Sequence, residues 1–180
     1  MRAVLDACVL FPTVLREILI GCAAEGMYRP AWSARILEEW ARATVRLGPG
    51  AEPVARAEIA LLQAAWPGAS FMADQDVMDR LSLPDPNDVH VLATAVAASA
   101  DVIVTFNAHD FPRATLAAEG IERLSPDQFL LAFQRVVPNA VQEVVGRVHG
   151  KAERLSGEAL PLRGLLKRTK LPKLAKALAA

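Results

Sequence analysis

The chain has 180 residues, of which 53% are hydrophobic and 22% charged. This is the composition of one ordinary domain that can bury a core, and it excludes a disordered or fibrous protein. Aromatic residues make up only 6%, so the core must use small and branched aliphatic side chains, which argues against an all-β sandwich. No apolar stretch approaches the roughly 18 residues of a membrane span. Two cysteines in a chain of this size favour free thiols, and we expect a cytoplasmic protein.

The net charge of zero hides an uneven distribution. Residues 151–180 hold eight Lys or Arg and two acids, and residues 1–150 carry the opposite surplus. An acidic body with a basic tail indicates a two-part chain. The cations of the tail, Lys167, Arg168 and Lys170 among them, could bind an RNA backbone, or the tail could fold back onto the acidic body. We expect a boundary at residues 137–139 that separates a domain over 1–136 from a basic helical extension over 137–180.

Short apolar runs predict strands at residues 3–9 and 101–106, with weaker patterns at 27–30 and 121–124. Helical periodicity predicts a helix over residues 14–22, a second that Ser33 caps and that carries the apolar residues from 36 to 47, and a third over 52–65. A fourth is predicted over 86–99 with Asp85 as its N-cap, and a fifth from Ser125 to Val136. After Val136 the sequence shows three more helical patterns and no strand. Strands that alternate with helices predict an α/β fold of three layers, with a central, mostly parallel sheet flanked by helices and a small all-helical C-terminal extension.

Carboxylates stand where an open α/β sheet places its ligand crevice, beyond the carboxyl ends of the strands. Asp6 follows the first predicted strand, and Thr105, Asn107 and Asp110 follow the strand that begins at residue 101. Asp88 lies on the apolar stripe of its predicted helix, where a carboxylate needs a strong partner. These positions favour one shared polar site.

Two further acids border this predicted site. Glu39 lies at the edge of the buried face of its helix, whereas Glu38 points toward solvent among arginines. Asp85 is explained as an N-cap, but it also stands three residues before Asp88. Clustered carboxylates raise one another's pKa unless a cation neutralises them. Hard oxygen ligands favour Mg²⁺ or Mn²⁺, which suits phosphodiester hydrolysis by a metal-activated water.

The ordered set of motifs resembles a PIN domain, the ribonuclease fold used by VapC-type toxins of bacterial toxin-antitoxin systems. The resemblance spans roughly residues 2–125 and rests on Val4-Leu5-Asp6-Ala7, Ser33-Ala34 with Glu39, Asp88 to Ala95, Val104-Thr105-Phe106-Asn107 and Asp110-Phe111. It implies a Mg²⁺- or Mn²⁺-dependent endoribonuclease in which Asp6, Glu39, Asp88 and an acid after the later strand bind one or two ions, with Thr105 assisting. It also implies an RNA substrate, a cognate antitoxin and a homodimer.

One position departs from the family pattern. Many PIN domains carry Asp where this chain has Asn107. The last ligand is therefore Asp110 or Asn107, or the site is a weakened one with three acids. Asp85 resembles an extra carboxylate in a branch of the family whose members are longer at the C-terminus.

Three hypotheses of function follow. The first is a metal-dependent endoribonuclease, the toxin of a VapBC-like pair. The second is a catalytically idle PIN-like module that binds RNA or a protein, which Asn107 would permit. The third is a Mg²⁺-dependent phosphatase of the haloacid-dehalogenase type, but that family places a second Asp two residues after the first, where this chain has Cys8.

Overall fold

The computed structural model describes residues 1–179. The chain packs into two compact units, one of residues 1–11 with 29–123 and another of residues 12–28 with the chain from Leu124 onward. The second unit thus combines an early segment with the C-terminal part. The boundary between residues 136 and 137, with a basic extension over 137–180, stays a prediction.

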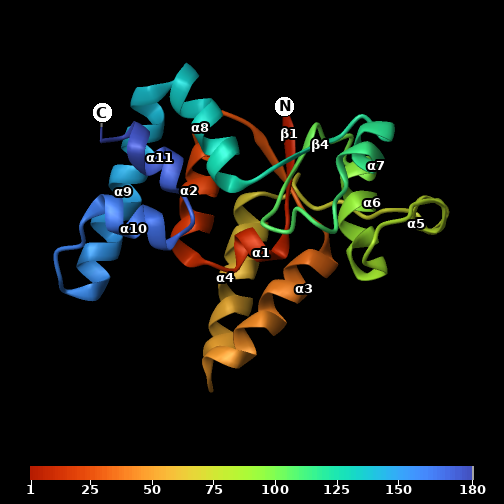
Figure 1. The fold of residues 1–180 in the computed structure, drawn as a ribbon. Helices are drawn as coiled ribbons and strands as arrows, with labels where there is room; N and C mark the ends of the chain where they lie inside the picture. The colour runs from red at the N-terminus through yellow and green to blue at the C-terminus, as the bar shows by residue number, and fades with distance from the viewer. Residues whose placement is uncertain (180) are drawn as a thin grey trace. The chain divides into compact units, whose positions relative to one another are not determined.

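The first unit is an α/β arrangement (Figure 1). Its elements in chain order are β1 (Arg2–Leu5), α1 (Ala7–Leu10), β2 (Arg29–Ala31), α3 (Ala34–Ala43), the 3-10 helix η1 (Thr44–Leu47), α4 (Ala51–Ala65), α5 (Gln75–Arg80), the 3-10 helix η2 (Pro86–Asp88), α6 (Val89–Ala97), β3 (Val102–Val104), α7 (Arg113–Ala118) and β4 (Glu122–Leu124), which ends at the boundary with the second unit.

The strands form one sheet with the order β2-β1-β3-β4. β1 is central and pairs in parallel with β2 and with β3, where Leu5 lies opposite Val104. The residues of β3 and the last three of β1 are buried, as expected for strands covered on both faces. The order reverses at β1, because the chain adds β2 on one side and β3 on the other. The carboxyl ends of β1 and β3 therefore flank a topological switch point.

The predicted strand over residues 3–9 is wrong beyond Leu5. The chain turns at Asp6, and the amides of Val9 and Leu10 donate to the Asp6 carbonyl to form the single turn of α1. Val9 and Leu10 are as buried as the strand residues, so apolarity alone does not distinguish the two structures. The short helices α5 and α7 were not predicted.

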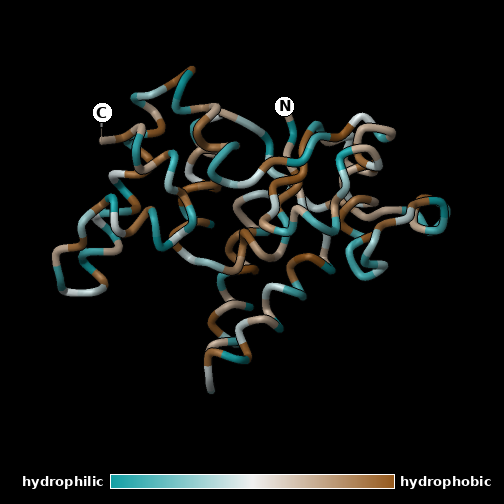
Figure 2. Tube along the Cα trace, viewed as in Figure 1, coloured by the Kyte–Doolittle hydropathy of each residue, from teal (hydrophilic) through white to brown (hydrophobic). Residues whose placement is uncertain are grey.

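Local signals explain the helices that position the site. Ser33 Oγ accepts a hydrogen bond from the Ile36 amide at 3.2 Å, which confirms the predicted cap of α3. Hydrophobic and hydrophilic segments alternate along α3 (Figure 2), and its apolar side buries Ile36, Leu37 and Trp40. Asp85 Oδ1 accepts from the Asn87 amide at 2.9 Å, so its predicted capping role is confirmed. The predicted helix over 86–99 begins with the 3-10 turn η2 and ends at Ala97.

The second unit is helical. It contains α2 (Thr13–Ala24), α8 (Pro126–Val136), α9 (Pro138–Ser156), α10 (Leu162–Arg168) and α11 (Pro172–Ala177). The three helices predicted after residue 137 are confirmed. Asp127 on α8 accepts hydrogen bonds from the amides of Lys173 and Leu174 at 3.0 and 2.9 Å. Because no side chain of its own caps α11, the buried Asp127 carboxylate satisfies its free amides and holds the basic helix in place.

The expected fold class is confirmed: the chain is an α/β protein with a central parallel sheet flanked by helices and a helical C-terminal part. Among the helices of residues 1–179, none combines the length and apolar character needed to cross a membrane.

Substitution of Gly21 should destabilise the second unit. A Cβ at Gly21 on α2 would lie 2.6 Å from Val144 Cγ1 on α9, and the stiff, buried valine cannot move away freely. We expect Gly21→Ala to lower the free energy of unfolding by about 1–3 kcal/mol in denaturant titrations. Gly146→Ala on α9 is the matched control, because its Cβ would meet no atom within 4 Å, and it should stabilise by about 0.5–1 kcal/mol. Equal effects of both substitutions would contradict the close packing.

Candidate functional site

Asp6 and Thr105 lie side by side at the switch point of the sheet. Each is the first residue after its strand, and the register of β1 with β3 brings them opposite one another. Thr105 Oγ1 donates a hydrogen bond to Asp6 Oδ2 at 2.6 Å, and both residues are buried. The buried carboxylate therefore has a partner that fixes its orientation.

Cys8 supports the same carboxylate. Its Sγ donates to Asp6 Oδ2 at 3.1 Å and accepts from the Phe106 amide at 3.3 Å. Burial, and secondarily the charge of Asp6, raises the pKa of Cys8 to about 12. Cys8 is therefore a neutral thiol that donates a hydrogen bond, and not a nucleophile.

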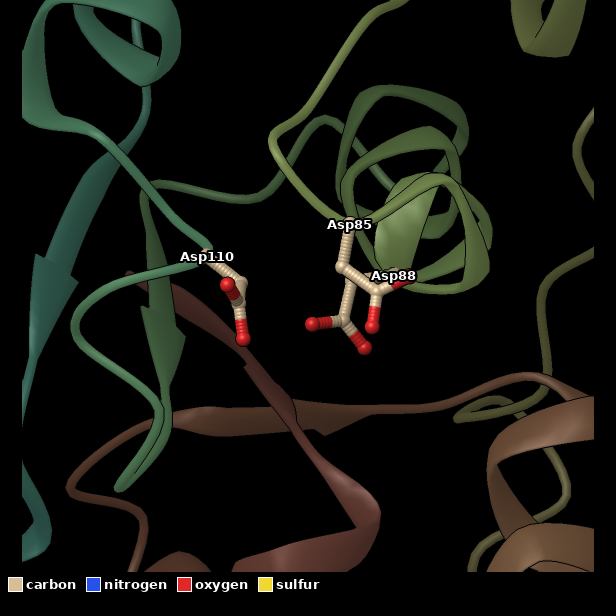
Figure 3. A group of neighbouring side chains, drawn as sticks. All are labelled: Asp85, Asp88 and Asp110. Atoms are coloured by element: carbon tan, nitrogen blue, oxygen red, sulfur yellow. The ribbon is translucent and has the colours of Figure 1, made fainter.

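Three acids gather beside this pair. One carboxylate oxygen from each of Asp85, Asp88 and Asp110 lies within 4.8 Å of the others. Figure 3 shows that Asp85 and Asp88 extend from the start of η2 and α6, and that Asp110 faces them from the loop after β3. Two elements distant in sequence thus bring three carboxylates into one space.

The pKa of Asp88 is raised by burial and by this group of neighbouring carboxylates. Its pKa is raised from 3.8 to about 6, first by burial and then by the charges of Asp6, Asp85 and Asp110. A shift of this sign shows that the protein disfavours the anion and would favour a bound cation. The influence of Asp6 places it in the electrostatic field of the cluster, although its oxygens lie outside the group of three.

Asn107 links the two sides of the cluster. Its side-chain Nδ2 donates to Asp88 Oδ2 at 3.0 Å and to Asp110 Oδ2 at 2.5 Å. Its backbone amide donates to Thr105 Oγ1 at 2.9 Å. His109 Nδ1 lies 2.9 Å from Asp110 Oδ1. The hydrogen bonds from His109 and Asn107 lower the pKa of Asp110. Asp110 is therefore an anion at neutral pH, next to a carboxyl that resists ionisation.

Glu39 has a different environment. Its Oε1 lies 2.9 Å from His90 Nε2 and 3.3 Å from Arg35 Nε. Burial alone would raise the pKa of Glu39, but the hydrogen bond and charge of His90, with those of Arg35, lower it overall. The structure places Glu39 against two bases rather than within the group of three acids. Its predicted role as a metal ligand stays a prediction.

Sequence reasoning did not find His90 and Arg35. His90 is only 5% exposed, and Arg35 also donates to the carbonyl of Asn87 at 3.2 Å. One signal in the sequence indicates that His90 is buried. Ala93 and Thr94, one helical turn further along, are small residues on the core-facing side of the same helix. No local pattern indicates that Arg35 reaches Asn87, because the two residues are 52 positions apart.

The predicted RNA-contacting cations lie in the second unit. Lys167, Arg168 and Lys170 are exposed at the end of α10 and just after it. Elsewhere in this unit, Lys151 pairs with Glu17 of α2 at 2.6 Å and Arg147 pairs with Glu25 at 2.7 Å. Part of the basic surplus therefore neutralises acids of the same unit. The three cations around α10 are exposed.

Comparison with protein families identifies the fold. The PIN domain family matches residues 2–109, a span that contains the predicted site residues of the first unit except Asp110. The chain belongs to the PIN domain family. Members of this family are generally metal-dependent nucleases. No curated protein and no solved structure matches the chain.

The donor set fits a divalent cation. Asp85, Asp88 and Asp110 supply hard carboxylate oxygens that lie within 4.8 Å of one another, and the raised pKa of Asp88 indicates that burial and the neighbouring carboxylates disfavour its charge. Such oxygens suit Mg²⁺, Mn²⁺ or Ca²⁺. The acidic cluster of this PIN domain is therefore compatible with the metal dependence of its family.

Proposed function

We propose that the protein is a metal-dependent endoribonuclease that hydrolyses RNA phosphodiester bonds. The observation that carries the proposal is the convergence of Asp85, Asp88 and Asp110 at the switch point of a PIN-domain sheet. A cation held there would neutralise the scissile phosphate and lower the pKa of an attacking water. Mg²⁺ and Mn²⁺ are the ions we propose, because both accept carboxylate ligands and retain waters.

The side chains around the cluster have separate roles in this proposal. Asp85, Asp88 and Asp110 hold the cation, with Asp6 as a further carboxylate on its sheet side. Thr105 and Cys8 orient Asp6 through hydrogen bonds.

Glu39 and Asn107 complete the proposed site. His90 and Arg35 lower the pKa of Glu39 and keep it anionic. Glu39 could therefore bind the same cation or accept a proton from the attacking water. Asn107 donates to both Asp88 and Asp110, which holds the two carboxylates in position and lowers the pKa of Asp110.

The test is metal-stimulated cleavage of RNA by purified protein. We expect cleavage of a mixed single-stranded RNA in Mg²⁺ or Mn²⁺, none in EDTA, and no hydrolysis of a small phosphomonoester. Products with a 5′-phosphate and a 3′-hydroxyl would agree with attack by water. Phosphomonoester hydrolysis without RNA cleavage would instead support the phosphatase hypothesis.

The idle PIN-like module is the second candidate function. Asn107 favours it, since its amide donates to two carboxylates and so partly satisfies the cluster without a cation. Substitution Asn107→Asp distinguishes the candidates. In an active enzyme it should retain or increase cleavage, whereas in an idle module it should create metal-dependent cleavage that the natural chain lacks.

We further propose that the protein is the toxin of a VapBC-like pair and acts as a homodimer. The PIN fold supports the first part. The exposed side chains of Val54 and Leu61, one heptad apart on α4, supply apolar surface for the second. Growth arrest on expression, relieved by Asp88→Asn or by a small protein encoded beside the gene, tests the toxin role, and sedimentation tests the dimer.

The cations around α10 should contribute RNA affinity and no chemistry. Reversal of charge at Lys167, Arg168 and Lys170 is expected to weaken binding and to reduce the slope of log K against log salt by about 2, the effect of three lost contacts to single-stranded phosphates. A variant with Lys and Arg exchanged at these positions keeps the charge and should bind like the natural protein. An unchanged slope after charge reversal would show that these cations are not RNA contacts.

A further inference from the structure

The first unit contains a cleft whose lining includes Arg35 of α3 and His90 of α6. Its volume is about 480 Å³, within the range of small-molecule sites. Apolar side chains dominate its walls, among them Phe71, Met72 and Met78. Met72 is 88% exposed, an unusual state for a thioether that has no partner to cover it. The proposed chemistry uses none of these apolar groups.

The cleft also contains an unsatisfied polar group. His90 lines it, and within residues 1–179 neither of its two buried ring nitrogens has a hydrogen-bond partner. The Glu39 carboxylate lies 2.9 Å from Nε2 as an ion-pair contact. Buried polar atoms are rarely left unsatisfied, so an occupant that offers a hydrogen-bonding group would complete the wall.

Two residues of the cleft connect it directly to the acids. His90 contacts Glu39. Arg35, which also lines the cleft, contacts Glu39 and donates to the Asn87 carbonyl, and Asn87 stands between Asp85 and Asp88. The side chain of Arg35 is about half exposed, at 51%. An anionic group bound beside Arg35 would therefore meet a cation that is linked through Glu39 and Asn87 to the proposed metal site.

We propose that this cleft binds one base of the RNA strand whose phosphodiester lies at the acidic cluster. The inference rests on the proposed nuclease function and names the substrate contact that selects the cut. A base has two apolar faces, for the methionines and for the face of Phe71 that the Arg2 guanidinium does not cover, and a hydrogen-bonding edge for the ring of His90. The adjoining phosphate is anionic and suits Arg35. An apolar protein side chain would fill the same walls but leave His90 unsatisfied.

Recognition of this kind requires an unpaired strand. A base inside a duplex presents neither face, whereas a base in a loop or single strand can be turned out and stacked on protein side chains. The proposed substrate is therefore single-stranded RNA, cut beside the base that occupies the cleft. Preference for particular bases comes from the fit of that one position.

Filling the cleft tests the inference. Ala73→Phe places a ring among its walls without altering an acid. Ala117→Phe is the matched control, because Ala117 is exposed on α7 and does not line the cleft. Binding of the four nucleoside 5′-monophosphates, which contain no bond for a nuclease to cut, is measured by calorimetry in Mg²⁺. We expect Ala73→Phe to weaken the best-bound nucleotide by about tenfold or more, the loss of one stacked base, and Ala117→Phe to change nothing.

Cleavage mapping provides the second readout. In a mixed RNA pool, Ala73→Phe should flatten the base preference next to the cut. If Ala73→Phe does not fold, Met72→Glu replaces it, with Leu155→Glu as the control for added charge, because both side chains are largely exposed and Leu155 does not line the cleft. Met72→Glu should weaken nucleotide binding and Leu155→Glu should not.

The outcomes separate this inference from the nuclease proposal. Nucleotide binding that is lost on filling the cleft, in a protein that cuts no RNA, would support the base site and overturn the nuclease. RNA cleavage with unchanged base preference and unchanged nucleotide binding in Ala73→Phe would overturn the base site alone. The base site is also overturned if filling the cleft abolishes only the binding of a protein partner.

Discussion

Asp88→Asn should abolish RNA cleavage while leaving the metal-free protein as stable as before, or more stable. Asn keeps the shape of the side chain but removes one of the mutually repelling charges at the cluster. We expect cleavage to fall by orders of magnitude, because the proposed cation loses a ligand and the scissile phosphate loses its counter-charge. Initial rates of RNA cleavage and melting curves in EDTA measure the two effects.

The raised pKa of Asp88 gives this prediction a pH dependence. Folding favours the protonated carboxyl, whose pKa rises from 3.8 to about 6, so the natural protein loses stability as pH rises through this interval. Asn does not titrate, and the advantage of Asp88→Asn should be absent near pH 4 and complete above pH 6. Because Asp88 is partly open to solvent, we expect an advantage of roughly 1 kcal/mol after screening.

Asp74→Asn is the matched control for Asp88→Asn. Asp74 is also the residue before a helix, α5, but its side chain makes no cap hydrogen bond and it lies outside the cluster. It should leave cleavage and its pH profile unchanged. Asp85→Asn preserves the helix cap that Asp85 supplies. It therefore tests the other role of Asp85, as a member of the acidic cluster. A destabilised Asp88→Asn protein that still cuts RNA at the natural rate would contradict the metal-site assignment.

Divalent metal should stabilise the folded protein strongly. The native state alone assembles Asp85, Asp88 and Asp110, so a cation binds it in preference to the unfolded chain. At a hundred times its dissociation constant, the ion adds roughly 2.7 kcal/mol. For a chain of this length that gain corresponds to roughly 5–10 °C in Tm. Melting curves across millimolar Mg²⁺ and Mn²⁺, each compared with EDTA, measure it.

Two comparisons identify the source of the metal effect. Asp88→Asn should shrink the increase in Tm, whereas Asp74→Asn should keep it. Ca²⁺ should stabilise without supporting cleavage, since it accepts the oxygen ligands but tolerates a looser geometry than Mg²⁺. An unchanged Tm across the whole range of Mg²⁺ and Mn²⁺ would favour the idle module.

The site was predictable from sequence where it depends on strand ends and helix starts. Asp6, Thr105 and Asn107 follow strands whose apolar runs are evident, and parallel strands end at one edge of a sheet. The cap role of Asp85 and the partly buried position of Asp88 follow from helix geometry. The membership of Asp85 in the acidic cluster was less evident, because its capping role already explained the residue.

Longer-range pairings were not predictable in this way. The pair of Glu39 with His90 joins α3 to α6, and the bond from Arg35 to the Asn87 carbonyl joins α3 to η2. Each depends on the angle between elements that are packed by apolar residues far from the polar ones. A helical wheel gives the face on which Glu39 lies, but not what lies opposite that face.

The sequence by itself determined the α/β class, the parallel sheet and the set of acids, because strand burial, helix periodicity and capping are local properties of the chain. Only the tertiary structure decided that Asp85, Asp88 and Asp110 form the closest group, and that Asn107 bridges two of them. It also decided that the chain from Pro12 to Tyr28 packs with the C-terminal helices. Gly21 allows α2 to approach Val144 of α9 closely, and such a fit between distant surfaces has no signature in either segment alone.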